Sequence, residues 1–246
     1  MHLLTTLAAL AYGTVSGLLL PRAAYKLAVP AGESWRSHCP AGHPARAWIG
    51  LSRCRNCATE IPTGARAGHW YGPSTLSLVL VTALACGVLA YGTGLRPELA
   101  VWLLTAPFFV LLALVDRTVH RLPDVLTLPL AAATLLLLAA ATLAPTAAGS
   151  WATALSGALA LGGLYFALFV ISPRSLGFGD VKLALALGAA LGWYGWRAVI
   201  IGTLAGQLLA AAVGLGLMAL RKAHATTAIP YGPFLICGTL VGMLAR

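Results

Sequence analysis

Acidic residues are scarce in this chain. Only six of its 246 residues are Asp or Glu, and charged residues of both signs make up 9% of the sequence, whereas 59% of the residues are hydrophobic. Soluble globular domains contain about 25% charged residues. The composition therefore excludes an ordinary soluble protein of this length and is typical of a membrane protein.

Long apolar runs account for this composition. A helix needs roughly 17–25 apolar residues to cross about 30 Å of hydrocarbon. The first run lacks a basic n-region and a good cleavage site, so we interpret it as a retained helix and not as a signal peptide. The sequence predicts an all-α polytopic membrane protein with about eight transmembrane helices, at residues 3–20, 75–94, 99–115, 125–143, 153–172, 181–196, 198–220 and 229–245.

The net charge of +10 predicts the topology of these helices. If the N-terminus lies outside, all but three of the 16 Lys and Arg residues fall in inside loops, and only Arg96, Arg197 and Arg246 lie outside. Cytoplasmic loops carry such an excess of basic residues. We therefore expect both termini outside and the large loop in the cytosol. Because topology and attraction to anionic lipid explain the charge, we expect the lipid bilayer as a partner and no nucleic acid.

Residues 21–70 form the only sizeable polar segment, between a first transmembrane helix at 1–20 and a transmembrane bundle at 71–246. The segment is rich in Pro, Gly, Arg and Cys and has little helical periodicity, which favours a small irregular domain. A domain of about fifty residues has a thin core and commonly needs a metal or a neighbouring element to stay folded. In the reducing cytosol its cysteines favour a metal over disulfides.

Four residues of this loop form a candidate zinc site. Cys54 and Cys57 make a CxxC pair, and Cys39 and His43 precede Cys54 by fifteen and eleven residues. Three thiolates and one imidazole complete the tetrahedral set of a structural zinc site. His38 is an alternative to His43, and a loop that has lost its metal is the competing interpretation.

Two of the three aspartates lie at the ends of apolar runs. Asp116 follows the run at 99–115 and Asp180 precedes the run at 181–196. An ionisable residue at membrane depth costs roughly 2.5–3.5 kcal/mol, so it indicates a function. On the same side of the membrane, one ionised and one protonated carboxylate would form the pair that aspartic proteases use to hydrolyse peptides. The alternative is helix capping, which suits Asp180 at a helix start but not Asp116 at a helix end.

Other residues near this pair are candidates for supporting roles. Gly177 and Gly179 would allow a substrate backbone to approach closely. Lys182 either tunes Asp180 and holds substrate or is an interfacial lysine of the positive-inside type. We interpret Asp124 as a helix cap. The remaining polar residues of the region form a solvated basic turn: Arg117, His120 and Arg121.

Two of these segments resemble the signature blocks of the type IV prepilin peptidases, which are bacterial membrane aspartic proteases of the GxGD class. They are Asp116 with Pro123-Asp124, and the heptapeptide Gly177-Phe178-Gly179-Asp180-Val181-Lys182-Leu183. The first span, the cysteine-bearing loop and the closing motif Ile229-Pro230-Tyr231-Gly232-Pro233-Phe234-Leu235 are also similar to the family. The resemblance thus covers nearly the whole chain.

The resemblance implies an enzyme of the bacterial cytoplasmic (inner) membrane. Asp116 and Asp180 would be its catalytic pair, and its reaction would be removal of the leader peptide from prepilins or pseudopilins at the cytoplasmic face. Family members also N-methylate the new N-terminus with S-adenosylmethionine. The sequence contains no recognisable nucleotide-binding strand-turn-helix, so the residues for this cofactor are unknown. It also departs from the family at Gly42, where a second CxxC cysteine is expected.

Two other functions compete with this prediction. A proton-coupled transporter could use the two carboxylates as a relay, but transporter sites lie near the bilayer midplane and both acids are expected at one surface. A non-catalytic membrane protein of pilus or secretion assembly has no need of two costly acids. The sequence therefore favours a membrane-embedded prepilin peptidase, with the pilus or secretion machinery as a possible partner.

Overall fold

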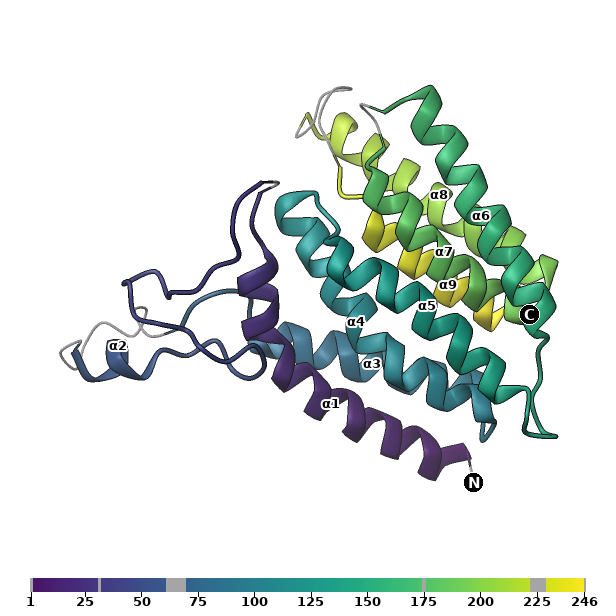
Figure 1. Ribbon diagram of the computed structural model, residues 1–246, viewed down its shortest axis with the longest axis horizontal. Helices are drawn as coiled ribbons and strands as arrows, with labels where there is room; N and C mark the ends of the chain where they lie inside the picture. Colours follow the sequence, from purple (N-terminus) through teal and green to yellow (C-terminus); the bar gives the residue numbers. More distant parts are fainter. Residues whose placement is uncertain (1, 31, 61–69, 174–175, 222–228, 246) are drawn as a thin grey trace.

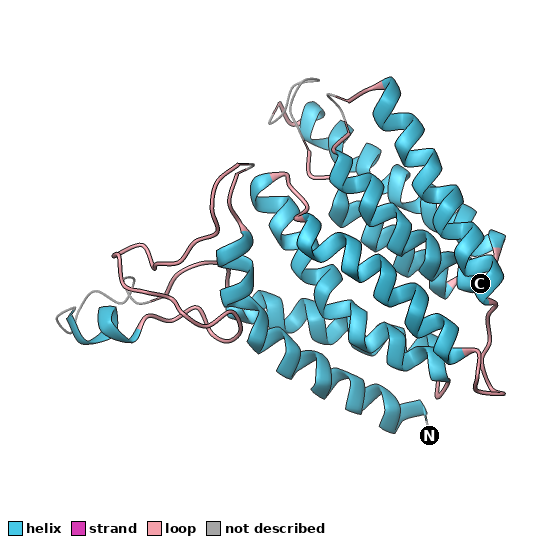
Figure 2. Ribbon diagram, in the orientation of Figure 1, coloured by secondary structure: helices cyan, strands magenta, loops and turns pink. Residues whose placement is uncertain are grey.

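The computed structural model describes residues 2–30, 32–60, 70–173, 176–221 and 229–245. These residues form helices and loops, with two isolated β-bridges and no strand (Figure 1 and Figure 2). The helices in chain order are α1 (His2–Leu27), α2 (Arg55–Glu60), α3 (Thr75–Thr93), α4 (Pro97–Val119), α5 (Asp124–Ala141), α6 (Trp151–Ile171), α7 (Phe178–Trp193), α8 (Trp196–Ala219) and α9 (Gly232–Leu244).

The predicted all-α membrane fold is confirmed. Within the described residues, six helices are long and apolar enough to cross a membrane, namely α1, α3, α4, α5, α6 and α8. α9 is a shorter apolar helix, and α7 has 16 residues. These two helices occupy the positions of the remaining predicted spans, and the count of eight spans stays a prediction.

α1 continues beyond the apolar run that predicted it. The run ends at residue 20, where Pro21 and Arg22 follow, but the helix extends to Leu27. Proline removes a backbone donor inside a helix. Here a loop residue stabilises the interrupted helix: the N–H of Arg22 donates to the carbonyl of Gly50 at 3.1 Å.

Glycines bring several helix pairs into backbone contact. A Cβ atom added to Gly13 in α1 would lie 2.6 Å from the carbonyl oxygen of Thr82 in α3. A Cβ on Gly157 in α6 would lie equally close, at 2.6 Å, to the carbonyl oxygen of Gly188 in α7. Small residues commonly mediate such close packing between membrane helices. The pairs α1–α3 and α6–α7 are therefore held by direct backbone contact.

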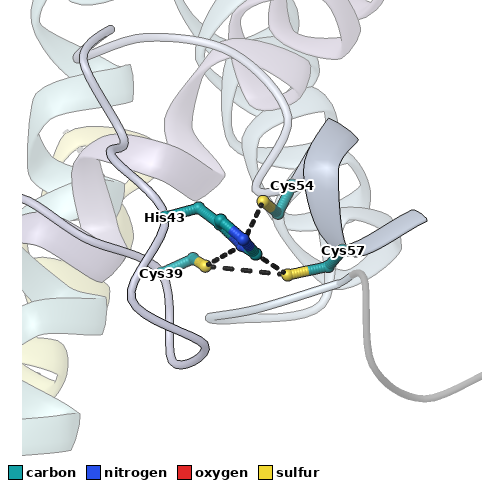
Figure 3. Close-up of side chains that lie close together, drawn as sticks. All are labelled: Cys39, His43, Cys54 and Cys57. Carbon is teal, nitrogen blue, oxygen red and sulfur yellow. Dashed lines mark hydrogen bonds between the residues drawn. The ribbon is translucent and has the colours of Figure 1, made fainter. Parts of the chain in front are cut away.

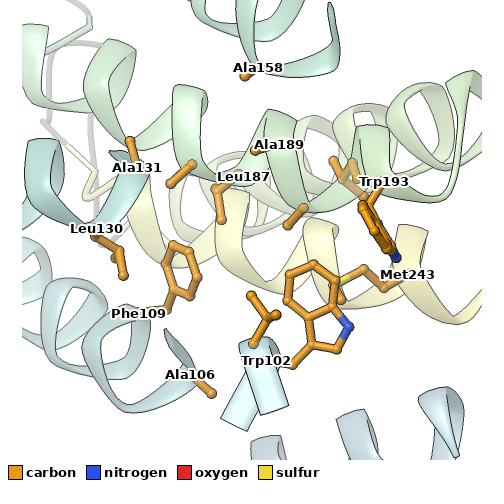
Figure 4. Close-up of a cluster of buried hydrophobic side chains, with 14 of the residues drawn as sticks. Trp102, Ala106, Phe109, Leu130, Ala131, Ala158, Leu187, Ala189, Trp193 and Met243 are labelled. Carbon is orange, nitrogen blue, oxygen red and sulfur yellow. The ribbon is translucent and has the colours of Figure 1, made fainter. Parts of the chain in front are cut away.

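α7 lies at the centre of the bundle. From Val181 to Trp193 every residue except Lys182 and Leu185 is buried, between α5, α6, α8 and α9. Figure 4 shows Leu187 and Trp193 of α7 among the side chains of the main core, which include Trp102 of α4 and Met243 of α9. The first turn of α7, which contains Asp180, is therefore fixed by the best-packed part of the molecule.

The segment between α1 and α3 is irregular apart from α2 and extends from one end of the bundle (Figure 1). It contacts the bundle near its two ends and also at Gly50, which bonds to α1. Near the first end, the Arg121 guanidinium of the α4–α5 turn donates to the carbonyl of Pro30 at 2.9 Å. At the other end Tyr71 packs edge-on against Tyr25 of α1, with ring centroids 4.7 Å apart.

Candidate active site and metal cluster

Asp116 lies buried in the last turn of α4. The backbone N–H of Gly232, the first residue of α9, donates to Asp116 Oδ2 at 2.9 Å. The N-terminus of a helix carries partial positive charge. The dipole of α9 therefore compensates for the unfavourable position of Asp116 at the C-terminal end of its own helix.

Close approach between Gly232 and Asp116 explains why a glycine begins α9. A Cβ atom at position 232 would lie 2.9 Å from Asp116 Oδ2. This distance is below normal van der Waals contact, so a larger residue would displace the carboxylate. The glycine thus contributes both the hydrogen bond and the space for Asp116.

Asp180 lies in the first turn of α7 and is also buried. The backbone N–H of Gly177 donates to its Oδ2 at 3.2 Å, which is the capping interaction considered as an alternative to catalysis. Capping uses only this oxygen. Oδ1 is buried and has no hydrogen-bond partner among the described residues. A buried polar atom without a partner costs about 1–3 kcal/mol, so capping leaves a cost that a bound water or substrate would relieve.

Both aspartates line one cavity of about 320 Å³, and their negative charges repel each other there. The structure thus brings together the two acids that the sequence singled out, which lie 64 residues apart in the chain. Two neighbouring buried carboxylates do not ionise independently. The pair can therefore supply one base and one acid to the same cavity. The other residues of its lining are His120, Arg121, Leu122, Asp124, Gly177, Phe178, Gly179 and Lys182.

Lys182 lines the same cavity but pairs with Asp124. Its Nζ lies 2.6 Å from Asp124 Oδ1 and 4.7 Å from the ring centre of Phe178. The interpretation of Asp124 as a helix cap is wrong. Asp124 is the first residue of α5, Pro123 is the N-cap, and the α5 cap has no side-chain hydrogen bond. The ion pair instead links the start of α5 to the start of α7, which keeps the two sides of the cavity together.

The two glycines of the GxGD motif differ in their surroundings. A Cβ on Gly179 would lie 2.8 Å from Cβ of Leu122 in the α4–α5 turn. A Cβ on Gly177 would meet Asp180 Oδ2 at 3.5 Å, which is an ordinary contact. Gly179 thus lets the α7 N-terminus pack against the turn that follows Asp116, whereas the contribution of Gly177 is its N–H donor.

A second cavity of about 300 Å³ has neither aspartate in its lining but reaches the residue next to Asp116. It is lined mainly by apolar residues of α3, α4, α7 and α9, and its lining includes Arg117 and Pro233. These two residues directly follow Asp116 and Gly232, the pair joined by the 2.9 Å hydrogen bond. From Arg117 the lining continues along α4 to Trp102, which is about 22 Å at 1.5 Å per residue. An apolar space therefore extends along α4 from the level of Asp116.

Cys39, His43, Cys54 and Cys57 converge in the α1–α3 loop (Figure 3). Their ligand atoms all lie within 4.8 Å of one another. In a tetrahedral site with Zn–S of about 2.3 Å and Zn–N of about 2.0 Å, two sulfurs are about 3.8 Å apart and sulfur and nitrogen about 3.6 Å. The Cys39 and Cys57 sulfurs are 3.7 Å apart, and His43 Nδ1 lies 3.2 to 3.7 Å from the three sulfurs. The four residues therefore fit a zinc ion.

A tight turn decides which histidine joins the cluster. Gly42 has φ +86°, and its N–H donates to the carbonyl of Cys39 at 2.9 Å, while the N–H of Cys39 donates to the carbonyl of His43 at 2.8 Å. This turn directs His43 toward the cysteines. His38, the alternative ligand, instead forms a 2.8 Å hydrogen bond with Ser37 and is not part of the cluster.

The thiols of the CxxC pair are poised for metal binding. The Cys57 backbone N–H donates to the Cys54 sulfur and lowers the pKa of that thiol to about 7. Burial raises the pKa of Cys57 to about 12. One thiolate is thus accessible near neutral pH, and a metal would have to displace a proton from Cys57.

Comparison with known proteins decides the family. A model of the type IV leader peptidase family matches residues 103–218, which include both aspartates. A protein of Aeromonas hydrophila named prepilin leader peptidase/N-methyltransferase is 35% identical over 232 residues, which cover 89% of this chain and 73% of that protein. The chain belongs to the type IV leader peptidase family. This finding confirms the predicted family and identifies the chain as a peptidase.

Further relatives of this leader peptidase carry the same name. The Burkholderia pseudomallei (strain K96243) protein is 34% identical over 227 residues, which cover 88% of this chain and 67% of the relative. The Pseudomonas aeruginosa protein is 28% identical over 234 residues, which cover 91% and 74%. No solved structure matches the chain.

Sequence reasoning missed two features of this peptidase's site. The apolar cavity has no motif, because any membrane helix presents similar side chains. The second feature is a pair of tyrosines: the hydroxyl of buried Tyr165 in α6 lies 3.5 Å from that of Tyr231, which precedes Gly232. Tyr231 belongs to the closing motif, so the sequence contained a signal for it, whereas Tyr165 had none.

Proposed function

We propose that this peptidase removes the leader peptide of prepilins or pseudopilins with Asp116 and Asp180 as an aspartic dyad. The observation that carries the proposal is that these two buried carboxylates line one cavity. Each has one oxygen held by a backbone N–H, from Gly232 or Gly177. The carboxylates are thereby oriented toward the cavity before any substrate binds.

The dyad acts as a unit that shares one proton. The ionised member takes a proton from a water molecule, whose oxygen adds to the scissile carbonyl carbon. The protonated member donates its proton to the departing amine as the C–N bond breaks. The two acids thus end the cycle with their protons exchanged, and no other catalytic group is required.

The reaction takes place at the cytoplasmic face of the bacterial inner membrane. The cavity is at the end of the bundle that carries the α1–α3 loop, since Arg121 of its lining donates to Pro30 of that loop. This loop contains many of the basic residues that favour a cytoplasmic location. A peptide bond at the membrane surface can therefore reach the dyad from the cytosol.

The apolar cavity binds an apolar segment of the substrate. Its lining continues from Arg117 and Pro233 into the bundle along α4 and α9. A chain lying there would bring its membrane-surface end to Asp116. We propose that this binding positions the scissile bond and limits cleavage to substrates with an apolar segment next to the leader.

The loop cluster holds a structural zinc ion through Cys39, His43, Cys54 and Cys57. When bound, the ion cross-links two parts of the loop and supplies stability that its thin core lacks. The names of the relatives also include N-methyltransferase, an activity that would use S-adenosylmethionine. We assign no residue of this chain to that cofactor.

The test is cleavage of a co-expressed prepilin by the wild type and by Asp116→Asn and Asp180→Asn, followed by mass spectrometry of the product. We expect both variants to insert normally and to lose cleavage. The matched control is Asp124→Asn, which changes the third aspartate of the same cavity and should retain cleavage. Processing by either dyad variant would refute the proposal. A wild-type product heavier by one methyl group would demonstrate methylation.

A further inference from the structure

A loop segment at residues 48–51 runs beside α1 well before the end of that helix. The N–H of Gly50 donates to the carbonyl of Leu19 at 2.8 Å, and the carbonyl of Gly50 accepts from the N–H of Arg22. The Arg22 side chain also donates to the carbonyl of Leu51 at 2.8 Å. Leu19 is about 12 Å from the end of α1 at 1.5 Å per residue. The segment thus returns along the helix toward its apolar part.

The side chains of this segment are apolar and uncovered. Ile49 is 64% exposed, Trp48 44% and Leu51 39%, so the described residues leave part of each side chain uncovered. Leu18 and Leu19 of α1, at the same level, are also exposed. Exposed apolar side chains beside a membrane helix continue the surface that faces lipid.

The segment is held in this arrangement by specific contacts. Gly50 has φ +111°, a conformation that other residues adopt only with strain. Trp48 packs edge-on against Trp35 with ring centroids 5.2 Å apart, and Lys26 Nζ lies 4.9 Å from the centre of the Trp48 ring. The apolar side chains are therefore presented outward by a fixed backbone.

Charge around the segment complements anionic lipid. Residues 21–60 contain six Arg or Lys residues and two Glu residues. Arg46 and Arg53 on either side of the segment are exposed. Each basic residue near an anionic leaflet contributes about 1 kcal/mol of attraction, and Trp prefers the interface between headgroups and acyl chains.

We propose that residues 48–51 insert Trp48, Ile49 and Leu51 into the boundary between headgroups and acyl chains, with the flanking arginines on anionic phosphates. The α1–α3 loop is thereby attached to the bilayer and not only to the bundle. The metal cluster lies in this loop, so the attachment keeps the cluster near the membrane surface. This inference does not depend on the proposed dyad, because it concerns only the loop and the lipid.

Photo-crosslinking of the full-length protein in liposomes tests the proposal. The photoreactive residue benzoylphenylalanine replaces Ile49, or as a matched control Ala41, which is exposed in the same loop beside the cluster. We expect lipid adducts at position 49 to exceed those at position 41 at least several-fold in intact-protein mass spectra. The yield should rise when phosphatidylglycerol replaces part of the phosphatidylcholine.

Equal adducts at both positions, or adducts to a second protein chain at position 49, would overturn the proposal. A yield independent of phosphatidylglycerol would overturn the contribution of charge. A second comparison uses Ile49→Glu and Ile49→Leu, which leave the packing of the folded protein intact because the side chain is exposed. Amide hydrogen exchange at residues 48–51 in liposomes should accelerate several-fold in Ile49→Glu and stay at the wild-type rate in Ile49→Leu. Unchanged exchange in Ile49→Glu would contradict insertion.

Discussion

Substitution of Gly232 by alanine tests how Asp116 is held without changing either aspartate. The added Cβ would lie 2.9 Å from Asp116 Oδ2, and an ordinary contact is about 3.4 Å or more. The carboxylate must therefore move by about half an ångström away from the α9 N-terminus. The hydrogen bond from the Gly232 N–H, now 2.9 Å long, would be weakened or lost.

The size of the effect follows from that hydrogen bond. A hydrogen bond to a charged group contributes about 1.5–3 kcal/mol, and about 1.4 kcal/mol corresponds to a factor of ten in rate. We therefore expect Gly232→Ala to lower the cleavage rate roughly 10- to 100-fold. The assay is single-turnover cleavage of a prepilin by purified peptidase in detergent, with the thermal midpoint measured in parallel.

Gly163→Ala is the matched control for this substitution. A Cβ at Gly163 in α6 would meet no atom within 4 Å, and alanine favours the helix. This variant should cleave at the wild-type rate. If Gly232→Ala also cleaves at the wild-type rate while correctly folded, then the contact between α9 and Asp116 has no part in catalysis and our reasoning about the site fails.

Three further predictions concern the surroundings of the site. Asp124→Leu should lower the free energy of unfolding by about 1–3 kcal/mol, because the Lys182 side chain is only 13% exposed and would lose its partner; an unchanged free energy of unfolding in chemical denaturation would contradict this. Metal content measured by mass spectrometry should fall in His43→Ala. In the wild type the affinity for zinc should fall more steeply as the pH drops below about 7, because Cys54, whose thiol has a pKa of about 7, then has to release a proton to bind the metal; a zinc affinity that does not change with pH would refute this. Ala113→Phe fills the apolar cavity and should slow cleavage of full-length prepilin several-fold while sparing a short soluble leader peptide. The control Ala160→Phe, on an exposed face of α6, should affect neither substrate.

The membrane helices were predictable because hydropathy and length decide which segments cross a bilayer. The extent of α1 was not, because the helix around Pro21 exchanges hydrogen bonds with Gly50, far away in the sequence. The burial of α7 could not be predicted from the sequence either. Its apolar run looks like that of a lipid-facing helix, although it lies at the centre of the bundle.

The two aspartates were predictable as candidates because acids are so rare in this chain. Their supporting contacts depend on residues distant in sequence. Asp116 is held by Gly232, 116 residues away, and the pairing of Lys182 with Asp124 could not be inferred from a helix-cap pattern. Among the metal ligands, the choice of His43 over His38 required the turn at Gly42.

The backbone contact between α6 and α7 bears on how variants of this enzyme should be interpreted. Gly188 lies about 12 Å along α7 from Asp180 and touches Gly157 rather than any substrate. Any side chain at either glycine would push the two helices apart. The N-terminal end of α7, which contains Asp180, would move as a result. In a library of random substitutions these glycines would therefore score as intolerant as the aspartates. Intolerance to substitution would therefore mark the contact between α6 and α7 as clearly as the proposed catalytic residues. Only assays of folding would distinguish the structural positions from the catalytic ones.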